Sequence, residues 1–161
     1  MISTMKGDDM DYEISEKDVA PQLSLTRRET VTMKTIGNGL DAGFARLKEH
    51  TAATGAETVG PPFVSSPDFG KDEFDLIICM PVASGAVAGE GVAVEEIPGA
   101  HVVFTTHVGP YTEVPEAYKA LFKWIEENGR KPAGAAREVY LNDPKDVPES
   151  ELLVEIAIPL A

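Results

Sequence analysis

Cysteine, histidine and long apolar runs are all scarce in this sequence of 161 residues. The single cysteine, Cys79, cannot form a disulfide within the chain, so we expect a reducing compartment, most simply the cytoplasm. No stretch approaches the roughly 18 to 20 apolar residues of a membrane-spanning helix, so no membrane partner is expected. Two histidines, His101 and His107, would lie about 20 Å apart along one strand at roughly 3.3 Å per residue. They cannot share a metal ion, and since nucleotide-binding glycine motifs are missing too, no metal or cofactor is expected.

Basic residues are also few. The chain has 27 acidic and 14 basic residues and a formal net charge of −13 with neutral histidines. Proteins that bind a DNA duplex neutralise its phosphates with Lys and Arg, and no basic stripe occurs here, so we expect no direct DNA binding. The same negative field attracts cations, although acidity that serves only solubility is an equally good explanation.

Two segments have the apolar period and the end signals of helices. The first covers residues 40–54, with Asp41 as the expected N-cap. The second covers residues 112–128, with Thr112 as the expected N-cap and Gly129 just after its end. The apolar stripe of the second helix consists of Ala117, Leu121, Trp124 and Ile125.

The remaining segments are typical of short strands separated by turn residues. Residues 1–18 are polar and form an expected flexible leader, which leaves residues 19–161 as the folded domain. The small, glycine-containing segment Ala83–Gly91 is the best candidate for a junction within this domain. The expected strands are Ala20–Glu29, Phe63–Ser65, Phe74–Val82, Val92–Glu96, His101–His107, Arg137–Leu141 and Leu152–Ile158.

A short internal repeat indicates two similar halves. The residues DLIICMPVA at 75–83 align with LVEIAIPLA at 153–161, and each segment follows a strand, a helix and a short strand. We therefore predict an α+β fold formed by tandem duplication of a strand–helix–strand–strand module, with halves at about 19–83 and 92–161. Antiparallel sheets related by a pseudo-twofold axis would leave a ligand cleft between the halves.

Period-two alternation in the last two strands indicates which side chains face that cleft. Glu138 and Tyr140 point the same way, and we expect Glu155 on the next strand to share their side. The opposite, β-branched face of the last strand should pack on the second helix. If this side of the sheet faced solvent, Glu138 and Glu155 would need no further explanation. A tyrosine beside a carboxylate on a half-buried face favours a site in which rings and charge surround a cation.

Other aromatic residues could complete such a pocket. Tyr111 follows a Gly-Pro turn at the start of the second helix, where it either holds the turn or lines the pocket. Phe63 matches the tyrosine of the other half approximately in the repeat alignment. Trp124 belongs to a helical stripe, which is more often core than ligand platform, and Phe104 lies in the middle of a strand. We include these four among the candidate ligand-binding residues, whereas Tyr118 is expected to pack.

Three segments carry a family pattern in a fixed order. They are EEIPGAHVVFTTH, THVGPYTEVPEAYKALFKWIEENG and REVYLNDPKDVPESELLVEIAIPL. Together they resemble the GyrI-like (gyrase-inhibitor-like) small-molecule-binding family, the effector-binding domain of AraC-type and MerR-type regulators. The resemblance extends from about Ala20 to the C-terminus and is most specific from Gly109 to Pro159. The family fold is a tandem duplication of a strand–helix–strand–strand module, in agreement with the repeat.

The resemblance implies a multidrug-type pocket with a glutamate, which the motif REVYLNDP places at Glu138, and with rings at Tyr111 and Tyr140. It implies a stand-alone protein that senses or sequesters a small lipophilic, toxic compound. A second alternative is a hydrolase that opens cyclopropane-containing alkylators, with Glu138 as base and Tyr111 as hydrogen-bond donor. Hydrolase-like members have HEIYLSDPRR here, and Arg137 replaces that histidine. A third alternative is a protein partner, either gyrase or a separate transcription regulator.

Overall fold

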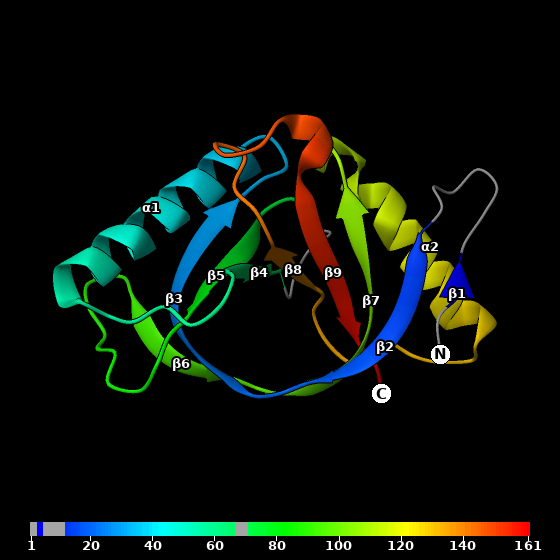
Figure 1. The fold of residues 1–161 in the computed structure, drawn as a ribbon, viewed down its shortest axis with the longest axis horizontal. Helices are drawn as coiled ribbons and strands as arrows, with labels where there is room; N and C mark the ends of the chain where they lie inside the picture. Colours follow the sequence, from blue (N-terminus) through cyan, green and yellow to red (C-terminus); the bar gives the residue numbers. More distant parts are fainter. Residues whose placement is uncertain (1–2, 5–11, 67–70) are drawn as a thin grey trace. The chain divides into compact units, whose positions relative to one another are not determined.

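The computed structural model describes residues 3–4, 12–66 and 71–161, which fall into two compact units (Figure 1). One unit is Ala20–Gly99, and the other combines the segment up to Val19 with Ala100–Ala161. Each unit consists of antiparallel strands and one long helix, so the fold is α+β as predicted. None of the described helices is long and apolar enough to cross a membrane.

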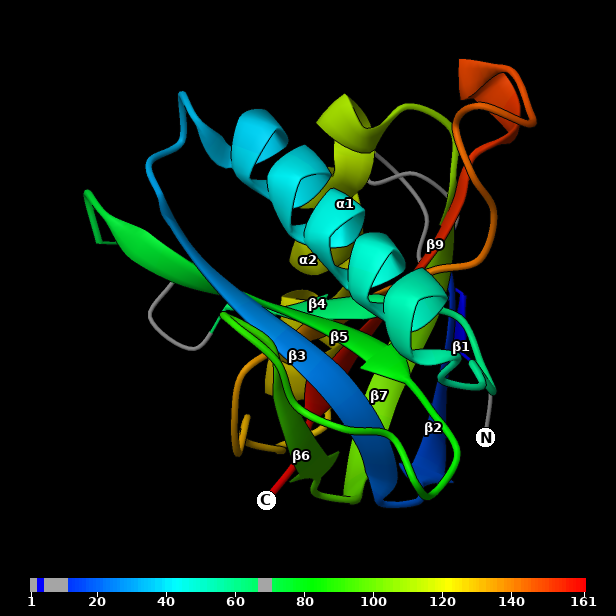
Figure 2. The same ribbon diagram turned by 90° about the vertical axis from the view of Figure 1, so that its left-hand side faces the viewer.

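The unit Ala20–Gly99 is a four-stranded sheet with a helix against one face. Its elements are β3 (Gln22–Val31), α1 (Ile36–Thr54), β4 (Phe63–Ser65), β5 (Phe74–Pro81) and β6 (Ala93–Ile97). The strand order is β4-β5-β3-β6, and α1 lies across β3 and β5 (Figure 2).

Helix α1 begins earlier than the sequence pattern predicts. Its N-cap residue is Thr35, and Asp41 lies inside the helix, so the prediction for that cap was wrong. A Cβ atom at Gly39 would lie 2.3 Å from Cγ1 of Val31, and one at Gly43 would lie 1.9 Å from Cδ1 of Ile78. These two glycines allow close packing on the sheet. Because glycine weakens helix propensity, Gly37 and Gly39 mask the first turn of the helix in the sequence.

The second unit has the strand order β1-β2-β7-β9-β8. Its elements are β1 (Ser3–Thr4), β2 (Glu13–Val19), β7 (Ala100–Val108), the short 3-10 helix η1 (Tyr111–Glu113), α2 (Val114–Glu127), β8 (Arg137–Tyr140), the 3-10 helix η2 (Glu149–Glu151) and β9 (Leu153–Pro159). Both units therefore contain, in chain order, a strand, a helix and two strands.

Helix α2 packs the predicted stripe against its sheet. Thr112 lies in η1 and is not the N-cap, because the chain makes a 3-10 turn before α2 begins at Val114. Gly129 follows the end of the helix as predicted. The buried residues of α2 are Val114, Ala117, Ala120, Leu121, Trp124 and Ile125, which pack with Ile14, Val103, Val154, Ile156 and Ile158.

The N-terminal segment contributes a strand where the sequence led us to expect part of a flexible leader. Strand β2 pairs with β7 in a register that places Ser15 opposite Phe104. Tyr12 and Ile14 are 4% and 0% exposed. The charged residues Glu13, Glu16 and Lys17 mask this short alternating pattern in the sequence. Residues 1–2 and 5–11 of the expected leader lie outside the described residues.

The two units divide between Gly99 and Ala100, later than the junction predicted at Ala83–Gly91. Strand β6 follows that segment and pairs with β3, so it belongs to the first unit. Hydrogen bonds also hold this segment in place: Nε2 of His50 lies 2.7 Å from the Val87 carbonyl oxygen. Arg27 donates to the carbonyl oxygen of Gly91, and Arg46 donates to that of Glu90.

Candidate functional site

The register of β8 and β9 determines which side chains share a face. Glu138 lies opposite Ile156 and Tyr140 lies opposite Val154, whereas Glu155 lies opposite Val139. Directly paired residues of antiparallel strands project from the same side. Since Ile156 and Val154 belong to the core under α2, Glu138 and Tyr140 face this helix. Glu155 faces the other way, so the prediction that it shares their side was wrong.

Two tyrosine hydroxyls hold the Glu138 carboxylate. Tyr118 of α2 donates to Oε2 over 2.6 Å, and Tyr140 of β8 donates to Oε1 over 3.2 Å. Tyr118 was expected only to pack. Its position at the edge of the buried stripe of α2 instead brings its hydroxyl to the strand. All three side chains are partly buried.

Two more rings extend this arrangement. The Tyr111 ring meets the Tyr140 ring edge-on, with centroids 5.6 Å apart and an interplanar angle of 74°. The Phe122 ring stacks on Tyr118 at 6.4 Å and 22°, and Phe122 is 48% exposed. We call Glu138, Tyr111, Tyr118, Phe122 and Tyr140 the Glu138 cluster. The sequence analysis missed Phe122, although its spacing of four residues from Tyr118 was a usable signal.

The tyrosines of the cluster have raised pKa values, which keeps their hydroxyls protonated. Burial, and then the Glu138 charge, raise the pKa of Tyr118 and of Tyr140 well above the ordinary value. Burial, and then Asp143, raise the pKa of Tyr111. Within residues 12–66 and 71–161, Glu138 has no hydrogen bond or ion pair with Lys, Arg or His. In the part of the chain that the structure describes, its hydrogen-bond donors are therefore neutral hydroxyls.

A family model described as the GyrI-like small-molecule-binding domain matches residues 12–161. The chain belongs to this family. A search of curated protein sequences gave no significant match.

Solved structures show the same fold in other proteins. The GyrI-like chain superposes on the C-terminal domain of EcmrR with a TM-score of 0.85 at 22% identity, covering 93% of this chain and 98% of that one. In the complex of EcmrR with DNA, it covers 57% of the EcmrR chain. It also resembles SAV2435 bound to tetraphenylphosphonium, with TM-score 0.63, 13% identity and coverage of 94% of both chains. A hydrolase from Listeria innocua gives a TM-score of 0.65 at 14% identity, covering 92% and 91%.

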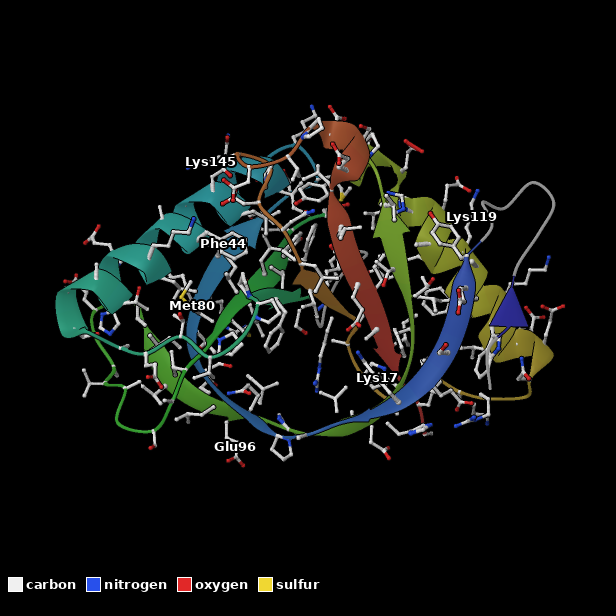
Figure 3. All side chains as sticks on the ribbon, in the orientation of Figure 1. Lys17, Phe44, Met80, Glu96, Lys119 and Lys145 are labelled. Carbon is white, nitrogen blue, oxygen red and sulfur yellow. The ribbon has the colours of Figure 1, made fainter. Side chains whose placement is uncertain are left out.

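In this GyrI-like chain the second candidate carboxylate, Glu155, has a cationic partner, unlike the hydroxyl partners described for Glu138. Lys17 on β2 (Figure 3) places Nζ 2.6 Å from Oε1 of Glu155 and 4.2 Å from the centroid of the Phe104 ring. The side chains of Lys17 and Glu155 are 38% and 16% exposed. Both candidates on this face, Phe104 and Glu155, already contact an ammonium group.

The other predicted residues lie elsewhere. Trp124 is 5% exposed within the core under α2, and its role as a ligand contact stays a prediction. Phe63 lies in the first unit, opposite Cys79 on β5, and its role in the pocket stays a prediction. Among the residues that the structure describes, no group of three or more His, Cys, Asp or Glu side chains could hold a metal ion.

Proposed function

We propose that this GyrI-like chain binds a lipophilic organic cation at the Glu138 cluster and thereby senses or sequesters toxic compounds in the cytoplasm. The observation that carries the proposal is a partly buried carboxylate that accepts hydrogen bonds from tyrosine hydroxyls and has no cationic partner among the described residues. A negative charge removed from water is costly unless it is compensated. A ligand cation would supply the compensation that two neutral hydroxyls provide only in part.

The rings make the ligand an organic cation rather than a hydrated metal ion. Aromatic faces attract cations, and the attraction grows when water is excluded. Tyr111, Tyr118 and Tyr140 also offer apolar surface to a large ligand body. The structure of SAV2435 with tetraphenylphosphonium supports this ligand class, because that cation is bulky and fully apolar at its surface.

Hydrolysis of a cyclopropane-containing alkylator is a second candidate on the same residues. Glu138 would activate water and Tyr111 would stabilise developing charge. The hydrolase from Listeria innocua gives this candidate support. Binding is favoured because both Glu138 oxygens already accept hydrogen bonds, so water must compete for them. Ring-opened product, followed by mass spectrometry and absent with Glu138→Gln, would establish turnover.

A protein partner, gyrase or a transcription regulator, belongs to the proposal only through the family resemblance. Direct DNA contact does not belong to it, since the net charge is −13. The tandem duplication, with its pseudo-twofold axis, is likewise proposed from the repeat and the common order of elements.

Isothermal titration with tetraphenylphosphonium tests the proposed function. Glu138→Gln keeps the shape of the side chain and removes its charge, so we expect affinity to fall about 10- to 30-fold, or about 1.4–2 kcal/mol. Glu155→Gln is the matched control and should leave affinity unchanged. A neutral probe of similar shape, triphenylphosphine oxide, should not distinguish the variants. Equal affinity of wild type and Glu138→Gln for the cation would refute the proposal.

A further inference from the structure

A fully buried histidine lies outside the Glu138 cluster, in the same unit of the fold. His107 on β7 is 0% exposed. Its Nδ1 atom lies 2.8 Å from the Tyr12 hydroxyl, and its Nε2 atom lies 3.0 Å from the carbonyl oxygen of Pro110. Tyr12 is 95 positions away in the sequence and 4% exposed. Neither residue touches Glu138, and the sequence analysis gave neither a role.

The two contacts define the direction of the hydrogen bonds. A carbonyl oxygen only accepts, so Nε2 of His107 carries the proton and donates to Pro110. In the tautomer that carries its proton on Nε2, Nδ1 accepts from the Tyr12 hydroxyl. Burial, followed by Glu116 and Glu113, raises the pKa of Tyr12 to about 12, which keeps this hydroxyl protonated. The chain of donation runs from Tyr12 to His107 to Pro110.

This series of hydrogen bonds ends at Pro110, in the turn that precedes Tyr111. Gly109 has φ 122°, a conformation that favours glycine, and its N–H donates to the Leu152 carbonyl over 2.9 Å. The Pro110 carbonyl also accepts from the N–H of Glu113 over 3.0 Å, which closes η1. Tyr111 is the next residue, and its ring meets Tyr140. Fixing Pro110 therefore fixes the origin of the Tyr111 side chain.

We propose that Tyr12 and His107 are positioning residues, which hold the Gly109–Pro110 turn so that the Tyr111 ring stays against Tyr140 in the Glu138 cluster. The effect on ligand affinity rests on the proposed function, whereas the position of the ring does not. The two can therefore fail separately.

NMR of protein with ¹³C-labelled tyrosine rings tests the position directly. The Tyr111 resonances, assigned by Tyr111→Phe, should carry a ring-current shift from Tyr140. We expect His107→Leu to collapse this shift. His107→Gln should restore most of it, because a carboxamide has both a donor and an acceptor. Tyr12→Phe should give a smaller loss, since it removes the group that selects the His107 tautomer.

His50→Leu is the matched control. His50 is the other buried histidine of the described residues, 6% exposed, and also bonds a backbone oxygen. Its replacement should lower the thermal midpoint and leave the Tyr111 resonances unchanged. If His107→Leu does not fold, the comparison of His107→Gln with Tyr12→Phe still decides the matter. A Tyr111 shift that stays at its wild-type value in folded His107→Leu and in Tyr12→Phe would overturn the inference.

Titration with tetraphenylphosphonium adds the functional readout. We expect His107→Leu to weaken binding about three- to tenfold in the wild-type background and to have no effect in Tyr111→Ala. A residue that merely stabilises the fold would weaken binding equally in both backgrounds, and that result would contradict positioning through Tyr111. If no variant, Glu138→Gln included, alters binding, the proposed function fails while the NMR result stands.

Discussion

Glu138 and Glu155 belong to neighbouring strands of one unit, and their carboxylates are stabilised in different ways. Glu138 faces α2 and accepts hydrogen bonds from two neutral tyrosine hydroxyls. Glu155 lies on the opposite face of the sheet and pairs with the Lys17 ammonium, which also lies over the Phe104 ring. The Glu155 site thus already contains both interactions, charge and ring, that an organic cation would make.

This difference teaches that an acidic, aromatic composition does not by itself mark a ligand site. Both glutamates lie near rings, and the overall charge of −13 acts on both. What separates them is the local partner. Glu155 pairs with the Lys17 ammonium, whereas Glu138 accepts hydrogen bonds from two tyrosine hydroxyls and has no cationic partner among the described residues. Variants that remove the partner of either carboxylate should therefore change its stability and its ability to bind a cation.

Removal of the tethered cation should have the largest effect. Lys17→Met leaves a partly buried Glu155 without its partner, and we expect the free energy of unfolding to fall by roughly 2 kcal/mol. That value lies between those of exposed and buried pairs, because Lys17 is 38% exposed. Chemical denaturation measures the loss.

The same variant should also open a second site. With Lys17 gone, Phe104 and Glu155 can receive an external cation, so titration should show two tetraphenylphosphonium ions per chain in place of one. Lys17→Arg is the control and should keep one. Lys17→Met with Glu155→Gln should regain stability and lose the second site. A single bound cation in Lys17→Met would show that Phe104 and Glu155 do not form a cation site even without the Lys17 ammonium.

Loss of a tyrosine hydroxyl should have a smaller effect of opposite sign on stability and binding. Tyr118→Phe removes the 2.6 Å hydrogen bond to Glu138 and keeps the ring. We expect the free energy of unfolding to fall by about 1 kcal/mol. We expect affinity for tetraphenylphosphonium to rise about two- to fivefold, because the cation meets a less compensated carboxylate. Tyr140→Phe, which removes a 3.2 Å bond, should change both less. Weaker binding in Tyr118→Phe would indicate that its hydroxyl serves the ligand directly.

Local patterns in the sequence predicted the elements well but not how neighbouring strands align. The strand Phe63–Ser65 and the buried stripe of α2 follow from period and turn residues alone. Whether Glu138 and Glu155 share a face depends on the β8–β9 register, which the connecting loop sets. In that loop the Asn142 side chain bonds the backbone of Glu151 and of Leu153. One residue more or less there would reverse the result.

Local sequence patterns also could not predict which side chains contact Glu138. Glu138 and Tyr140 were identified from a motif on one strand, but the shorter hydrogen bond comes from Tyr118, 20 positions away on α2. Trp124 and Tyr118 lie on the same helix, and the sequence analysis took the first as a ligand contact and the second as a packing residue. Only the packing of α2 decides that the first is core and the second reaches the carboxylate.

A third carboxylate, Glu16 on β2, extends the comparison to a more exposed setting. It lies 2.6 Å from Nη1 of Arg130 and 3.0 Å from Nε2 of His101, whose Nδ1 lies 2.8 Å from Asp18. Hydrogen bonds to Glu16 first, and then to Asp18, raise the pKa of His101. Hydrogen bonds from His101 first, and then from Arg130, lower the pKa of Glu16. Solvent screens these contacts, so their effect should be the smallest of the three sites.

The sign of each shift fixes the pH window. The raised pKa of His101 adds stability that is present below its ordinary value of 6.5 and is lost as pH rises through the folded value. The lowered pKa of Glu16 adds stability that is present above its ordinary value of 4.5 and is lost as pH falls through the folded value. The difference in thermal midpoint between wild type and His101→Gln should therefore be largest between pH 4.5 and 6.5 and should vanish in alkaline solution. A difference that stays constant with pH would mean that His101 holds β2 to β7 through neutral hydrogen bonds, and that Glu16 relies on Arg130 rather than on His101 for its cationic partner.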